Sequence, residues 1–141
     1  MGEMTVIHRE NSEFAVLVRD HVVYLDQPYS AGGMDGGPTP VELFVASLAA
    51  CAAHYARRYL QWRGLPADGL EVTADYAMSA GTPARVSRIG LRLRPPISLA
   101  DGDAEEMRRA AEGCTVHNTL VDPPRIGLEV VTEARAAEPA A

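Results

Sequence analysis

The alternation of apolar and polar residues near the start of the chain predicts three short strands, at residues 4–9, 13–19 and 21–26. The second and third contain FAVLV and HVVYLD, which are rich in the β-branched and aromatic residues that favour strands. Only the short RDH stretch lies between them, so they are expected to form a hairpin. The glycine- and proline-rich stretch QPYSAGGMDGGPTP comes next and predicts a loop.

A long helix is predicted after this loop, and it should end near Arg63. In the stretch TPVE, Thr39 can cap the helix, Pro40 suits its first position and Glu42 completes a capping box. Almost every residue from there to Ala53 is apolar, and a helix that is apolar on all sides must be buried on all sides. One sheet can cover only one side, so a second copy of the chain is expected to cover the rest.

The second half of the chain predicts a strand pair, another helix and a last strand. LEVTADYAM and RVSRIGLRLR alternate with a period of two residues and predict the strand pair. The helix is expected to start at about Asp103, and RIGLEVVTEA, residues 125–134, predicts the last strand. Residues 135–141 are expected to be a frayed tail. With neither a repeat nor a linker, residues 1–141 are predicted to form a single α+β domain.

Composition narrows the classes of function that fit this chain. Its 141 residues carry a formal net charge of −6, which disfavours binding to nucleic acids or anionic membranes. All 13 basic residues are arginine, so chemistry that needs a lysine is excluded. The uncharged run 43–56 is too short to span a bilayer, and the N-terminus lacks the order of a secretory signal. A cytoplasmic protein is therefore expected.

Cys51 lies inside the apolar helix, and its neighbours suggest chemistry. At about 100° per residue, His54 and Tyr55 share its face, and Arg58 returns to that face two turns later. Two interpretations stay open. The cysteine can be a small buried apolar residue, or it can be a reactive thiolate whose pKa a nearby cation lowers.

The second cysteine, Cys114, permits a metal interpretation as well. CTVH at this position repeats the spacing of CAAH at Cys51, so the two pairs could supply two thiolates and two imidazoles to zinc. This spacing arises easily by chance, and no C-x-x-C motif accompanies it.

Two stretches carry a resemblance to a known family. GGMDGGPTPVELFVASLAACAAHYA resembles the cysteine-helix region of the OsmC/Ohr family, the osmotically inducible and organic hydroperoxide resistance proteins. AAEGCTVHNTL, followed by a predicted strand, resembles the second-cysteine region of the same family. The order of the predicted elements agrees with this resemblance over nearly the whole chain.

The resemblance implies a fold, a dimer and a reaction. The fold would be an intertwined homodimer in which antiparallel sheets from both chains wrap two long central helices. Cys51 would match the peroxidatic cysteine and Cys114 the resolving one, with organic hydroperoxides as substrates. The reductant would be a dithiol such as dihydrolipoamide, and neither a metal nor a flavin would be required. From the net charge, neither nucleic acid nor a membrane is expected as a partner.

The chain departs from the hydroperoxide-resistance branch at one position. That branch places a catalytic glutamate directly after the helix proline, where this chain has Val41. Glu42 comes one residue later and nine residues before Cys51, about 900° of helix rotation, so it should face away from the thiol. The sequence PVEL resembles the OsmC-like branch more closely. Of the arginines in the N-terminal strands, Arg19 is the best candidate to assist Cys51, with Arg9 second.

Three functions therefore follow from the sequence. The first is a thiol-dependent peroxidase with Cys51, Cys114 and Arg19 as its catalytic residues and His54, Tyr55 and Glu42 in support. The second is an OsmC-like protein without peroxidase activity that binds a small apolar ligand at the dimer interface. The third is a Cys2His2 zinc protein.

Overall fold

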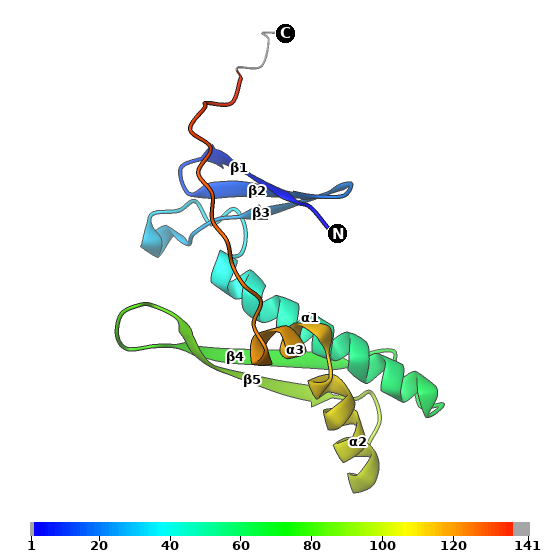
Figure 1. Cartoon of the computed structure of the whole chain (residues 1–141). Helices are drawn as coiled ribbons and strands as arrows, with labels where there is room; N and C mark the ends of the chain where they lie inside the picture. Colours follow the sequence, from blue (N-terminus) through cyan, green and yellow to red (C-terminus); the bar gives the residue numbers. More distant parts are fainter. Residues whose placement is uncertain (1, 137–141) are drawn as a thin grey trace.

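The computed structural model describes residues 2–136, which form two antiparallel sheets and three α-helices (Figure 1). Sheet A has the order β1–β2–β3, and sheet B pairs β4 with β5. The elements of the first half are β1 Thr5–Glu10, β2 Glu13–Val18, β3 His21–Leu25, the short 3₁₀ helix η1 Tyr29–Ala31 and α1 Pro40–Trp62. Those of the second half are β4 Glu71–Met78, β5 Val86–Arg94, α2 Asp101–Glu112 and α3 Thr115–Val121.

The predicted start of α1 is confirmed, and local hydrogen bonds explain it. The Thr39 hydroxyl accepts from the backbone N–H of Glu42, and the Glu42 carboxylate accepts from the backbone N–H of Thr39, both at 3.1 Å. Pro40 occupies the first turn, where a missing N–H costs no hydrogen bond. At the other end the chain turns at Gly64, whose φ of +68° is in the left-handed region that glycine adopts without strain.

The core lies where α1 crosses sheet B and α2. Its buried residues come from the face of α1 that follows Cys51 and from the inner side of α2. They are Ala52, Ala56, Tyr59, Leu60, Met107 and Ala111. The partly buried Leu91 and Leu93 of β5 pack against them. This packing places α2, and with it the α2–α3 corner, beside the middle of α1.

Sheet A stands apart from this core, beyond the N-terminal end of α1 (Figure 1). Val6, Phe14 and Leu25 belong to one of its faces, and Leu17 and Val22 to the other. Both faces are thus apolar, yet Val6 is 55% exposed and Val22 51%. A sheet with two apolar faces needs cover on both sides, and the described part of the chain does not supply it.

The predicted last strand is wrong for the single chain. Residues 122–134 form no strand, although the stretch from Ile126 to Val131 is rich in β-branched and apolar residues. A strand needs an adjacent edge to bind its backbone groups, and this segment pairs with neither sheet. Its apolar side chains are consequently exposed, with Leu128 at 97%.

Two further differences concern the C-terminal half. α2 starts at Asp101, two residues earlier than predicted, and the separate helix α3 was not predicted. Of the predicted frayed tail, residues 137–141 lie outside the described residues. No helix of the described part is both long and apolar enough to cross a membrane.

Candidate functional site

The two cysteines lie together although 62 residues separate them in the sequence. Cys51 is half-buried in α1, whereas Cys114, which directly precedes α3, is fully buried. Both are free thiols. Burial raises the pKa of the Cys114 thiol and the neighbouring Cys51 raises it further, although hydrogen bonds from backbone N–H groups of α3 act in the opposite direction. The fold therefore places a half-buried and a fully buried thiol beside each other.

The corner between α2 and α3 positions Cys114. Its Sγ accepts a hydrogen bond from the backbone N–H of His117 at 3.3 Å and so caps α3. The Nδ1 of His117 lies 2.6 Å from the carbonyl oxygen of Glu112, and the Asn118 amide donates to the carbonyl of Gly113 at 3.2 Å. These contacts tie the first turn of α3 to the last residues of α2.

Tyr55, one turn after Cys51, connects α1 to this corner. Its hydroxyl lies 3.0 Å from the hydroxyl of Thr115, the residue after Cys114. His54 packs edge-on against the Tyr55 ring, with 5.7 Å between the ring centroids. The Arg58 guanidinium lies 5.6 Å from the centroid of the same ring. His54 and Arg58 therefore both contact Tyr55 in the part of α1 that follows Cys51.

A cavity of about 300 Å³ opens between α1, β5 and the α2–α3 corner, with Cys114 in its wall. Most of its lining is apolar, and it comprises Leu48, Ala52, Ile89, Leu91, Leu93 and Ala111. Arg108, Glu112 and His117 add polar groups. The Arg108 guanidinium is held by Glu105, with N–O distances of 2.6 and 2.9 Å, and by Glu112. Its charge is thus balanced locally, and the cavity fits a small apolar group.

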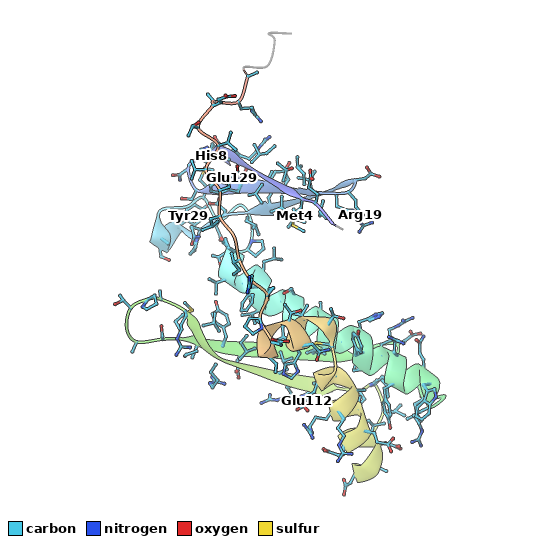
Figure 2. The ribbon with its side chains drawn as sticks, viewed as in Figure 1. Met4, His8, Arg19, Tyr29, Glu112 and Glu129 are labelled. Atoms are coloured by element: carbon cyan, nitrogen blue, oxygen red, sulfur yellow. The ribbon has the colours of Figure 1, made fainter. Side chains whose placement is uncertain are left out.

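The arginines proposed to assist Cys51 lie elsewhere in the single chain. Arg19 is exposed at the turn between β2 and β3, with a φ of +50°. Figure 2 shows it at the free end of sheet A, away from α3. Arg9 lies on β1, where its Nε is 3.9 Å from Glu13 and its guanidinium 5.9 Å from the ring centroid of Tyr24. An action of Arg19 on Cys51 stays a prediction, and within one chain the two residues are not brought together.

The zinc interpretation finds no support in residues 2–136, where no three His, Cys, Asp or Glu side chains gather as a metal site. The two cysteines meet, but the histidines have other neighbours. His54 packs against Tyr55 on the exposed side of α1, and the Nδ1 of His117 is occupied by the Glu112 carbonyl. Spacing alone could not predict this, because it does not set the direction of either imidazole.

Asp26, which no sequence pattern predicted as a functional residue, is 1% exposed directly after β3. Its carboxylate accepts hydrogen bonds from the backbone N–H groups of Gln27 at 2.7 Å, Gly36 at 3.0 Å and Met34 at 3.3 Å. Hydrogen bonds from Gly36 and then Gln27 hold the pKa of Asp26 below its usual value, although burial opposes them. Asp26 thus shapes the loop that leads into α1. An acidic residue between an apolar strand and a glycine-rich loop was the available signal.

Tyr59 was missed for a different reason. Its hydroxyl donates to Glu106 at 2.9 Å and to Asp103 at 3.2 Å, which joins α1 to α2. Burial, followed by these two carboxylates, raises the pKa of Tyr59 to about 12. Both partners are more than 40 residues away, so no local pattern revealed them.

Comparison with known proteins identifies a family that matches the sequence and solved structures that share the fold. The OsmC-like protein family matches residues 33–129. No curated protein matches the chain by sequence. Among solved structures, a candidate osmotic stress induced and detoxification response protein from Psychrobacter arcticus is 19% identical. It has a TM-score of 0.78, with 84% of this chain and 88% of that chain covered.

Two further solved structures show the same architecture. The OsmC-like protein of Mycoplasma pneumoniae is 19% identical with a TM-score of 0.71, and 87% of this chain and 89% of that chain are covered. The organic hydroperoxide resistance protein OsmC of Legionella pneumophila is 20% identical with a TM-score of 0.64, and the covered shares are 84% and 88%. At these identities the likeness establishes the fold.

Proposed function

Because the chain belongs to the OsmC-like protein family, we propose that it reduces organic hydroperoxides with Cys51 as the peroxidatic thiol and Cys114 as the resolving thiol. The observation that carries this proposal is that a half-buried and a fully buried free thiol from distant parts of the chain are neighbours in the fold. Two interacting free cysteines beside an apolar cavity are what a two-thiol peroxidase requires. The Legionella protein of similar fold is named for organic hydroperoxide resistance, which agrees with this substrate class.

The reaction follows from thiol chemistry. The Cys51 thiolate attacks the distal oxygen of the hydroperoxide, the O–O bond breaks, and the alkoxide takes a proton and leaves as an alcohol. The Cys114 sulfur then attacks Sγ of the Cys51 sulfenic acid, and hydroxide leaves as water after protonation. A dithiol reductant of the dihydrolipoamide class donates two electrons and two protons to reduce the disulfide.

Accessibility and ionisation support the assignment of the two roles. The raised pKa of Cys114 keeps this thiol protonated at neutral pH, and a protonated thiol is a poor first nucleophile. Cys51 is half-buried and accessible, so a hydroperoxide can meet it first. The apolar cavity in contact with Cys114 would accommodate the organic part of the substrate.

A homodimer is part of the proposal. Phe44 on α1 is 38% exposed, and the faces of sheet A and the residues around Leu128 are exposed as well. A second copy would cover these surfaces and offer a sheet edge to residues 125–134, which have the composition of a strand. Arg19 would then reach Cys51 only from the other copy. Sedimentation at micromolar concentration should show a dimer, and a stable monomer would contradict this part of the proposal.

We place the protein in a reducing compartment, the cytoplasm. There both cysteines would remain free thiols between turnovers, as a dithiol-driven cycle requires.

The function can be tested by mapping the oxidation products. Substoichiometric cumene hydroperoxide should convert the wild-type protein to the Cys51–Cys114 disulfide, as seen by mass spectrometry. Cys114→Ser should retain a Cys51 sulfenic acid that dimedone traps, and Cys51→Ser should remain reduced. Oxidation of Cys114 while Cys51 stays reduced would show that the roles are reversed. If neither the disulfide in the wild type nor the sulfenic acid in Cys114→Ser forms, the proposed peroxidase function is wrong.

A ligand-binding function is the second candidate, and two observations favour it. Val41 stands where the hydroperoxide-resistance branch has its glutamate, and the cavity is lined by Cys114 but not by Cys51. On this alternative the protein binds a small apolar molecule without turnover. Binding of an apolar fluorophore, combined with thiols inert to hydroperoxide, would favour it over the peroxidase.

A further inference from the structure

The hydrogen bond between Tyr55 and Thr115 occupies a particular place in the site. Tyr55 comes one helical turn after Cys51, and Thr115 comes directly after Cys114, so each partner is next to one of the two thiols. Within residues 2–136 it is the only hydrogen bond that joins α1 to α3. The other hydrogen bonds and ion pairs between this helix and the C-terminal half run from Tyr59, and from Arg63 directly after α1, to Asp103 and Glu106 of α2.

The other hydrogen bonds of the corner do not link it to α1. His117 and Asn118 hold α3 to the end of α2, so they keep the corner intact without linking it to the cysteine helix. The core residues Met107 and Ala111 pack α2 against α1, but they come before Cys114. Beyond Cys114, Tyr55 supplies the only such hydrogen bond of the described residues.

We propose that Tyr55 and Thr115 are positioning residues that hold Cys114 against Cys51 for disulfide formation. The proposal rests on the proposed function only in that these two thiols react with each other. The bond that forms is Sγ–Sγ, and the Cys51 sulfenic acid loses hydroxide, which leaves as water. Tyr55 and Thr115 take no part in these bond changes. Their hydrogen bond increases the fraction of time in which the Cys114 sulfur is positioned to attack Cys51.

The first step, oxidation of Cys51, does not need Cys114, so Thr115→Val should leave its rate unchanged. The second step should slow by about two- to ten-fold when the hydrogen bond is lost, which is the factor that one hydrogen bond typically represents. Tyr55→Phe and Thr115→Val remove the bond while keeping the size of each side chain. Thr115→Ser retains a hydroxyl and should keep most of the rate.

A double-mutant cycle separates this bond from other effects of either residue. If the two hydroxyls act through each other, the Tyr55→Phe/Thr115→Val double variant should be no slower than the slower single variant. Equal slowing of both steps would instead mean that Tyr55 acts on Cys51 itself. An unchanged second step in Tyr55→Phe, or fully additive losses, would overturn the proposal.

Two oxidants distinguish failure of this inference from failure of the proposed function. With cumene hydroperoxide, stopped-flow fluorescence follows oxidation, and dimedone trapping measures how long the sulfenic acid persists. With 5,5′-dithiobis(2-nitrobenzoate), Cys51 releases one thionitrobenzoate, and attack by Cys114 on Cys51 Sγ releases a second. This second release needs no peroxidase activity. If hydroperoxide does not react but Tyr55→Phe slows the second release, the function is wrong and the positioning role stands.

Discussion

Oxidation of Cys51 and Cys114 to a disulfide should stabilise the fold substantially, because the bond would connect distant parts of the chain. The closed loop would contain about 63 residues, and closing such a loop removes about 14 cal/mol/K from the unfolded chain. At 25 °C this entropy corresponds to about 4 kcal/mol of stability.

A local loss offsets part of this gain. The Cys114 Sγ now accepts a hydrogen bond from the His117 N–H and contacts a closely packed corner. Weakening this cap costs about 1 kcal/mol, the usual value of a helix cap. The net gain is then about 3 kcal/mol. With an unfolding entropy of about 2.1 cal/mol/K per residue, it corresponds to a rise in Tm of roughly 10 °C.

Unfolding of reduced and oxidised protein provides the assay. Protein treated with dithiothreitol and protein oxidised with diamide are compared in urea and by calorimetry at one protein concentration, because dimerisation itself shifts Tm. Thiol titration and mass spectrometry establish that the oxidised sample contains the intrachain bond. Cys51→Ser and Cys114→Ser are the matched controls and should not respond to diamide. An intrachain disulfide that leaves Tm unchanged or lowers it would refute the reasoning, because the folded site would then resist the bond.

Three further predictions concern residues outside the thiol pair. Glu42→Ala should lower the free energy of unfolding by about 0.5–1 kcal/mol, because the capping box is lost, and should keep the reactivity with hydroperoxide. Glu42→Gln should lower stability by a smaller amount. A large loss of rate in a normally folded variant would show that Glu42 is catalytic. Because the pKa of Asp26 is depressed in the fold, its contribution to stability is present above about pH 4 and is lost as the pH falls. In an acid titration followed by circular dichroism, Asp26→Asn should therefore lose stability less steeply than the wild type. Identical titration curves would contradict this. Burial and two carboxylates raise the pKa of Tyr59 to about 12, so its contribution to stability is present below about pH 10 and is lost as the pH rises towards 12. In urea titrations at increasing pH, Tyr59→Phe should not show this loss of stability. A profile like that of the wild type would exclude ionisation of Tyr59 as the cause.

Elements set by neighbouring residues were predictable. The start of α1 could be predicted from the sequence, because Thr39, Pro40 and Glu42 set it within one turn and need no other part of the chain. The two sheets were predictable as well, since alternation and short turns specify antiparallel pairing. The identity of the candidate thiols was also available from the sequence, because Cys51 and Cys114 are the only cysteines.

Tertiary structure decided what these elements do together. The packing of α2 on α1 brings Cys114 near Cys51 and Thr115 within hydrogen-bond distance of Tyr55. The two histidines have separate neighbours, the Tyr55 ring for His54 and the Glu112 carbonyl for His117. Residues 125–134 have the pattern of a strand but pair with neither sheet in the single chain. Helix caps and the alternation of apolar and polar residues depend on positions only a few residues apart, so they can be predicted from the sequence. Contacts between distant side chains depend on how whole elements pack, and that packing is settled only when the chain has folded.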